Sequence, residues 1–240
     1  QEIAPVTGEV GLHAAPVVAG NTIIIGAAHA VGGAPASREN VKGYVRGYDV
    51  RTGQLRWTFH VVPRPGEFGA DTWGAGSLTQ SGDLGAWCCL SADEELGYVY
   101  VPLTAPTAAY YGGHRPGDNL FSNSLVALNA ETGDRVWHFQ MVHHDIWNFD
   151  TPTAPILLDT DNGPIVAQAT KQGYVYAFNR ETGEPVWPIE EVPMTASTVP
   201  GEQLSPTQPI PSKPAAFEYV GSSEELLVDF TPELKQQALQ

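Results

Sequence analysis

The sequence has few cysteines, few basic residues and no long apolar run. Its two cysteines, Cys88 and Cys89, are adjacent, which excludes the spaced ligand pairs of a zinc site. Lys and Arg number 12 against 27 Asp and Glu, giving a formal charge of −15. Because binding to nucleic-acid phosphates requires a basic face, this balance argues against a nucleic-acid partner. Without a run of about 18 apolar residues, the sequence predicts no membrane-spanning helix.

The Cys88–Cys89 pair allows two interpretations. Free cysteine is commonly buried as a small apolar residue, which predicts two buried thiols within a strand. Adjacent cysteines can also close a strained vicinal disulfide in an oxidising compartment. The sequence leaves both open.

Glycine and proline are abundant, with 25 and 20 residues, and only 16% of residues are charged. This composition favours short strands joined by turns over a helical protein. A chain of 240 residues is long enough to bury a substantial core. The composition therefore predicts an all-β fold.

A motif of the form Asp/Asn-x-x-Thr-Gly-x-x-x-Trp occurs three times. Its copies are YDVRTGQLRWTF at 48–59, LNAETGDRVWHF at 128–139 and FNRETGEPVWPI at 178–189. The acid or amide can bond nearby backbone, and the glycine can take the positive φ of a tight turn. The motif predicts a hairpin whose second strand carries a large ring for packing between repeats.

Strand-like runs precede each motif, including NTIIIGA at 21–27, GYVRGYD at 43–49 and GYVYAFN at 173–179. Each unit is predicted to form about four antiparallel strands, which is one blade of a β-propeller. The whole of 1–240 is interpreted as part of one propeller domain. Its approximate blades are 12–60, 73–140 and 151–189, followed over 190–240 by an extended loop and the start of a helix. Closure requires about four to eight blades, so the remaining blades are expected in the same or another chain.

Chemistry-bearing residues are concentrated in 136–150, VWHFQMVHHDIWNFD. Two long irregular stretches, 62–81 and 104–123, resemble binding loops carried by a rigid scaffold. Several segments then resemble one family, the PQQ-dependent quinoprotein dehydrogenases of the membrane-associated glucose/quinate/alcohol branch. The segments are 91–102, 111–129, 136–155 and 169–173, together with the motif at 129–137, which is similar to the family's tryptophan-docking motif.

The resemblance implies about three blades of an eight-bladed propeller that carries pyrroloquinoline quinone (PQQ) on its axis. It implies Ca²⁺ or another divalent cation beside the cofactor and a periplasmic location. The implied reaction oxidises an alcohol, sugar or cyclic polyol and passes electrons to a quinone or cytochrome. The alternative function is a non-catalytic propeller scaffold, or a degenerate quinoprotein that lacks the base.

The resemblance also implies roles for individual residues. Lys171 corresponds to the lysine that contacts the quinone oxygens. Relatives carry an aspartate base directly after the tryptophan of the His-His-Asp segment, where this chain has Asn148. Because a neutral amide cannot accept a proton, Asp150 and Asp145 become the candidate bases.

Other candidates are less specific. His143 and His144 are interpreted as ligands or proton shuttles, or as hydrogen-bonding residues that fix the loop beside the cofactor. Trp147 is a candidate pocket wall or a core residue. Asp83 and Asp71 are the candidate cation ligands, with turn capping as the alternative role for each.

Overall fold

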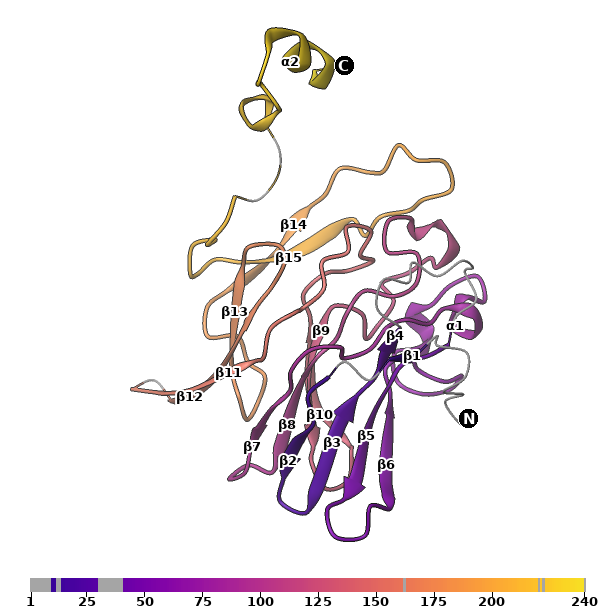
Figure 1. Cartoon of the computed structure of the whole chain (residues 1–240), viewed down its shortest axis with the longest axis vertical. Coiled ribbons are helices and arrows are strands. Elements are labelled where there is room, and N and C mark those ends of the chain that lie inside the picture. The colour runs from indigo at the N-terminus through magenta and orange to yellow at the C-terminus, as the bar shows by residue number, and fades with distance from the viewer. Residues whose placement is uncertain are drawn as a thin grey trace.

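The computed structural model describes residues 10–11, 14–29, 41–161, 163–219, 221 and 223–239. Over these residues the regular secondary structure is mainly antiparallel strands, which confirms the predicted all-β class (Figure 1). The helices of the described part are short, and none is long and apolar enough to cross a membrane. Strands β1 (Val10–Gly11) and β4 (Ala28–His29) form a small separate pair.

Two four-stranded sheets follow each other along the chain. The first has the order β2 (Val17–Ala19), β3 (Thr22–Gly26), β5 (Tyr44–Asp49) and β6 (Leu55–His60). The second has the order β7 (Ser91–Asp93), β8 (Tyr98–Pro102), β9 (Ser124–Asn129) and β10 (Arg135–Gln140). Each places its first strand at one edge and its tryptophan-bearing strand at the other.

The third sheet has three strands, β11 (Ile156–Thr160), β12 (Gly163–Ala169) and β13 (Val175–Asn179). The expectation of about four strands in this unit was therefore wrong. Past β13, a single bridge joins Phe178 to Pro185. Pro185 and Pro188 lack the N–H groups that a ladder requires, so a regular fourth strand does not form around Trp187.

The first strands of the sheets lie next to one another, since β7 contacts both β2 and β11. This arrangement matches neighbouring blades of a propeller, whose first strands lie side by side. The limits of the individual blades stay a prediction.

A two-stranded ribbon follows the third sheet, where an extended loop was expected. β14 (Ile189–Pro193) pairs antiparallel with β15 (Thr207–Pro211). The assignment of this region as loop was wrong, because its many prolines argue against strands although β14 and β15 form. A ribbon that pairs along one side tolerates residues without an N–H.

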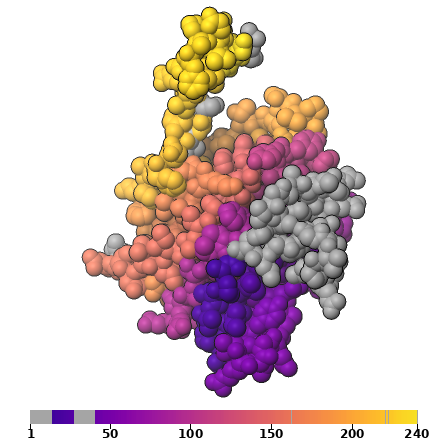
Figure 2. Space-filling view, viewed as in Figure 1, coloured from indigo at the N-terminus to yellow at the C-terminus, as the bar shows by residue number. Residues whose placement is uncertain are grey.

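The C-terminal segment ends in α2 (Pro232–Ala238), which lies away from the sheets (Figures 1 and 2). The predicted helix start is confirmed, with Thr231 as its N-cap and Pro232 in the first turn.

Tryptophan docking joins successive sheets. Trp57 of β6 donates its indole N–H to the carbonyl of Ala130 at 3.1 Å, and its ring lies on Gly133, where an added Cβ would meet the ring at 2.5 Å. Trp137 of β10 repeats this contact, donating to Arg180 O at 3.1 Å and lying on Gly183. Each ring therefore packs on the Thr-Gly turn of the following repeat.

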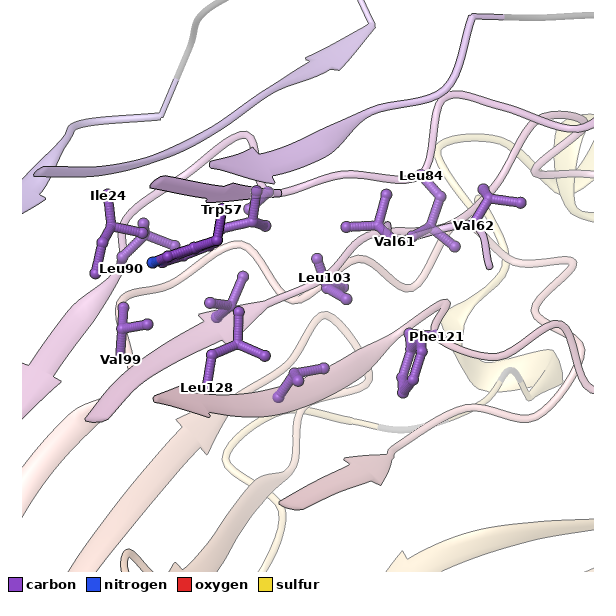
Figure 3. Close-up of a cluster of buried hydrophobic side chains, with 14 of the residues drawn as sticks. Ile24, Trp57, Val61, Val62, Leu84, Leu90, Val99, Leu103, Phe121 and Leu128 are labelled. Carbon is purple, nitrogen blue, oxygen red and sulfur yellow. The ribbon is translucent and has the colours of Figure 1, made fainter. Parts of the chain in front are cut away.

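The core fills the spaces between sheets. One buried cluster surrounds Trp57 and includes Ile24, Val99 and Leu128 (Figure 3). A second surrounds Trp137 and Phe178 between the second and third sheets. Stacked in this way, the rigid sheets fix the positions of the loops that leave their strands.

Candidate functional site

Three segments remote in sequence meet at the candidate site. They are the loop after β8 (103–123), the loop after β10 (141–155) and the turn between β12 and β13 (170–174). Thr151 Oγ1 donates to Leu103 O at 2.7 Å, and Thr170 N donates to Tyr174 O at 3.0 Å to close the turn. This turn carries Lys171 to the site.

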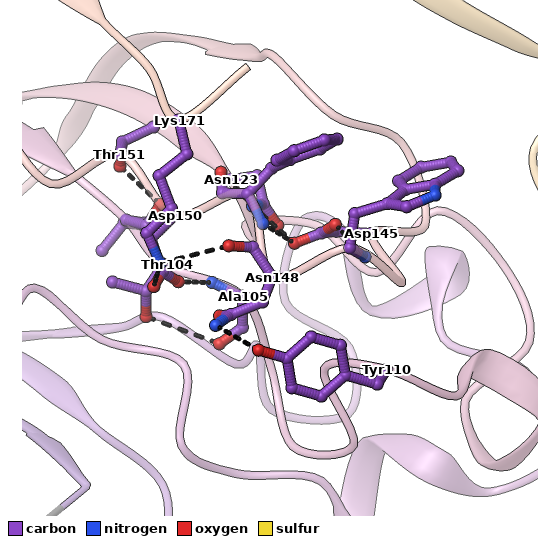
Figure 4. Close-up of polar contacts among 12 residues, drawn as sticks. Thr104, Ala105, Tyr110, Asn123, Asp145, Asn148, Asp150, Thr151 and Lys171 are labelled. Carbon is purple, nitrogen blue, oxygen red and sulfur yellow. Dashed lines mark hydrogen bonds and ion pairs between the residues drawn. The ribbon is translucent and has the colours of Figure 1, made fainter. Parts of the chain in front are cut away.

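Lys171 and Asp150 form an ion pair, with Nζ 2.6 Å from Oδ2 (Figure 4). Lys171 Nζ also donates to Asn148 O at 3.1 Å, and Asp150 Oδ1 accepts from the Ala105 amide at 2.9 Å. The Lys171 side chain is 36% exposed and that of Asp150 is 12% exposed. The site therefore presents an accessible ammonium backed by a largely buried carboxylate.

Asn148 links this ion pair to an exposed tyrosine. Its backbone has the left-handed φ of 57°, and its Nδ2 donates to the Tyr110 hydroxyl at 3.1 Å. Tyr110 is 75% exposed. Beside it in sequence, Trp147 is 36% exposed and stacks on Phe149 with ring centroids 5.7 Å apart. Such exposure excludes a core role for Trp147 and suits a pocket wall.

Asp145 lies buried beneath the same turn. Its Oδ1 accepts from Trp147 N at 2.8 Å, and its Oδ2 accepts from Phe149 N at 2.8 Å and from Asn123 Nδ2 at 3.0 Å. Burial raises the pKa of Asp145, while these hydrogen bonds oppose the shift. The contacts make Asp145 the residue that shapes the 145–149 turn, and of the two candidate bases only Asp150 contacts Lys171.

Arg115 is a buried residue of the site that the sequence did not single out. Its guanidinium donates to the carbonyls of Thr107, Ala108 and Asp145 and to Asn119 Oδ1. Burial lowers the pKa of Arg115 to about 10, although nearby carboxylates favour the charged form. An arginine among only 12 basic residues, inside a loop resembling the family, was the available signal.

The two histidines contact neither Lys171 nor Asp150. The ring of His143 bonds to Gln140 Oε1 and Glu191 Oε1, at 3.1 Å each, and thus faces β14. His144 is buried, with Nδ1 2.6 Å from Gly117 O and its pKa lowered by burial. These contacts match the predicted loop-fixing role, and a direct role toward a cofactor stays a prediction.

The two proposed cation ligands lie in different local surroundings. Asp71, in a helical turn (Ala70–Thr72), lines a surface hollow with Glu67 and Phe68. Asp83 has φ 61°, and its amide donates to Val41 O. Among the described residues, no three His, Cys, Asp or Glu side chains are grouped to hold a metal ion. Ca²⁺ takes six to eight oxygen ligands, which include backbone carbonyls and water as well as carboxylates, so either aspartate alone would supply only part of a site.

Cys88 and Cys89 are free thiols with their sulfurs 2.8 Å apart. Both cysteines are half-buried, and Cys89 forms an isolated β-bridge with Ala15 outside any strand. The expectation of two buried thiols within a strand was therefore wrong. Burial and the neighbouring thiol raise the pKa of Cys88 to about 11. A high pKa disfavours a reactive thiolate.

Comparisons with known proteins match this description. A family profile described as glucose/ethanol/alcohol dehydrogenase β-propeller domain, of the PQQ type, matches residues 2–240. Quinate/shikimate dehydrogenase (quinone) from Acinetobacter baylyi is 34% identical over 81% of this chain and 24% of that protein. Quinoprotein glucose dehydrogenase from Escherichia coli is also 34% identical, with the same two coverages.

Among solved structures, a quinohemoprotein alcohol dehydrogenase from Pseudomonas putida superposes with a TM-score of 0.63 and 32% identity. The match covers 82% of this chain and 30% of that one. The chain thus spans about a quarter of the length of the relatives named above. With strand order, tryptophan docking and sequence in agreement, the chain belongs to the family of PQQ-type glucose/ethanol/alcohol dehydrogenase β-propeller domains.

Proposed function

We propose that this chain is part of a dehydrogenase that uses PQQ to oxidise the hydroxyl of an alcohol, sugar or cyclic polyol. Electrons would pass to a quinone or cytochrome, and the enzyme would work in the periplasm. The main supporting observation is the accessible Lys171–Asp150 pair at a junction of three loops. The printed activities of the relatives, quinate/shikimate and glucose dehydrogenation, support the substrate class.

The residues present fit an anionic quinone ligand. Lys171 Nζ has three N–H donors and uses two on Asp150 and Asn148, which leaves one for a ligand oxygen. The exposed side chain of Trp147, the residue before Asn148, provides an aromatic surface. When bound, PQQ supplies a two-electron acceptor. No three His, Cys, Asp or Glu side chains of the described residues are grouped to hold a cation, so no step is assigned to it.

Asp150 is the base in this proposal. Each carboxylate oxygen has two acceptor sites, so a substrate hydroxyl can bond beside the contacts from Ala105 and Lys171. The proton moves from the substrate oxygen to the Asp150 carboxylate, and the Lys171 ammonium stabilises negative charge that develops nearby. Asn148 cannot take this proton, and Asp145 is fully buried beneath the 145–149 turn, where a substrate hydroxyl does not reach it.

Reconstitution tests the proposal. The full-length protein is loaded with PQQ and Ca²⁺ and assayed with an artificial dye acceptor on alcohols, sugars and cyclic polyols. Asp150→Asn is expected to lower kcat by at least about 10²-fold with PQQ binding retained, which is the usual size of a general-base effect. Wild-type turnover that survives in Asp150→Asn would reject Asp150 as the base.

Asn148 supports a second candidate function, because an amide stands where relatives carry the base. In this function the protein is a degenerate quinoprotein that binds PQQ without turnover. Asn148→Asp distinguishes the two. A wild type without turnover and an active Asn148→Asp variant would establish the degenerate form. Turnover by the wild type at a rate at or above that of the variant would exclude it.

A further inference from the structure

Tyr110 and Asn148 form a polar contact at the exposed side of the site. The Asn148 Nδ2–Tyr110 hydroxyl bond of 3.1 Å joins the loop after β8 to the loop after β10. Figure 4 shows Asn148 between Tyr110 on one side and the Lys171–Asp150 pair on the other. One residue therefore contacts both groups, through its side chain to Tyr110 and through its carbonyl to Lys171.

Buried contacts hold these two loops together. Arg115, 1% exposed, donates to the carbonyls of Thr107 and Ala108 in one loop and of Asp145 in the other. A planar guanidinium that bonds to fixed carbonyls on two segments restricts their relative motion. The exposed Tyr110 ring is thus carried by a loop with a rigid base.

The residues after Tyr110 are anchored from a second direction. Tyr111 donates its hydroxyl to Pro200 O at 3.0 Å, and Gly112 N donates to Glu202 Oε1 at 2.9 Å. Both acceptors lie in the loop between β14 and β15. Tyr110 and Tyr111 are therefore neighbours with different tasks, since Tyr111 fixes the loop and Tyr110 faces the site.

The Tyr110–Asn148 pair retains hydrogen-bonding capacity. Their mutual bond runs from Asn148 Nδ2 to the Tyr110 oxygen, and within the described residues neither the Tyr110 O–H proton nor Asn148 Oδ1 has a hydrogen-bond partner. A free O–H donor beside a free carbonyl acceptor is complementary to a hydroxyl group, which both accepts and donates. Both groups are uncharged, in contrast to the adjacent ion pair.

We propose that Tyr110 and Asn148 bind a second substrate hydroxyl, and that this pair selects polyhydroxy substrates over monohydric alcohols. The inference rests on the proposed dehydrogenase function. The reacting hydroxyl lies at Asp150, and a neighbouring hydroxyl donates to Asn148 Oδ1 and accepts from Tyr110. A site that bonds a substrate hydroxyl discriminates against the analogue without it, because its polar groups then lose their partner.

The test compares matched substrates in the full-length protein loaded with PQQ and Ca²⁺. The pairs are cis-1,2-cyclohexanediol with cyclohexanol, and glycerol with 1-propanol. Tyr110→Phe removes the hydroxyl and keeps the ring, and Tyr111→Phe is the matched control. In Tyr110→Phe the preference for the diol, measured as the ratio of the two KM values, is expected to fall about tenfold, as for one lost hydrogen bond. Tyr111→Phe is expected to keep the wild-type ratio.

Two results would overturn the inference: an unchanged ratio in Tyr110→Phe, or an equal loss in both variants. If the wild type oxidises none of the four compounds, no KM ratio can be measured, and a binding measurement decides whether the pair holds a hydroxyl. Saturation-transfer NMR then follows cis-1,2-cyclohexanediol on the wild type and on Tyr110→Phe. Saturable binding weakened about tenfold in the variant supports the pair, whereas equal or absent binding rejects it.

Discussion

Lys171 is one of few basic groups in an acidic chain, and its ammonium points to a carboxylate and a carbonyl from the preceding loop. Lys171→Ala is expected to weaken PQQ binding by about 10- to 100-fold, the usual effect of losing a charged hydrogen bond. Fluorescence titration of the full-length protein measures the affinity, with Lys235→Ala in the exposed α2 as control. An unchanged affinity would remove Lys171 from the cofactor site.

His138 provides a pH-dependent measurement of stability. Burial and then the Arg135 guanidinium lower the pKa of His138 to about 4, and the neutral ring lies 3.1 Å from Arg135 Nη1. Since the folded pKa lies below the unfolded value of about 6.5, this contribution to stability is present above pH ~6.5 and is lost as the pH falls toward 4.

Relative to His138→Phe, the wild type should lose about 1–2 kcal/mol of unfolding free energy between about pH 7.5 and pH 5, after allowance for partial exposure. Urea denaturation at both pH values measures the difference. The prediction fails if the two proteins respond to pH in parallel.

Sequence reasoning reached part of the site and missed the rest for a definable reason. Lys171 and Asp150 stand in recognisable local patterns, so both were named. Arg115 and Tyr110 act through partners 30 and 38 positions away, respectively, and no local pattern reveals such contacts. The separation of roles between Asp145 and Asp150 likewise depends on burial and on which amides each carboxylate faces.

The Thr-Gly turn is the element that joins one sheet to the next. Gly133 has φ 76° and lies under the Trp57 ring, whereas Gly53 has φ 69° at the same motif position with nothing within 4 Å. Gly133→Ala adds a clash to the backbone strain, and Gly53→Ala adds strain alone. We expect destabilisation of about 2–4 kcal/mol for Gly133→Ala and about 1 kcal/mol for Gly53→Ala. Equal urea midpoints would show that docking on Gly133 contributes little.

Elements with a clear period were predicted well. The run at 173–179 contains β13, and the alternation at 43–49 contains β5. The fourth strand of the third repeat was predicted and does not form, whereas the β14–β15 ribbon was not predicted, and proline explains both errors. Pro185 and Pro188 prevent a ladder where the repeat predicted one, while Pro209 and Pro211 lie within a strand that pairs along one side.

At the scale of the molecule, the two ends of the docking series differ from its interior. Trp187 is half-buried, and its indole has no hydrogen-bond partner among the described residues. We propose that a further repeat of the propeller covers this ring. Trp187→Ala is then expected to destabilise the full-length protein by about 3 kcal/mol, similar to Trp137→Ala. A loss below about 1 kcal/mol in thermal or chemical unfolding, with Trp137→Ala still costly, would contradict the proposal.

In both junctions that the structure describes, the tryptophan of one repeat docks on the glycine turn of the next. These two junctions are therefore built from the same two parts. Gene duplication or deletion of one whole repeat creates a junction whose ring and turn already match. Proteins of this architecture can thus change in length by recombination while the reactive loops diversify independently.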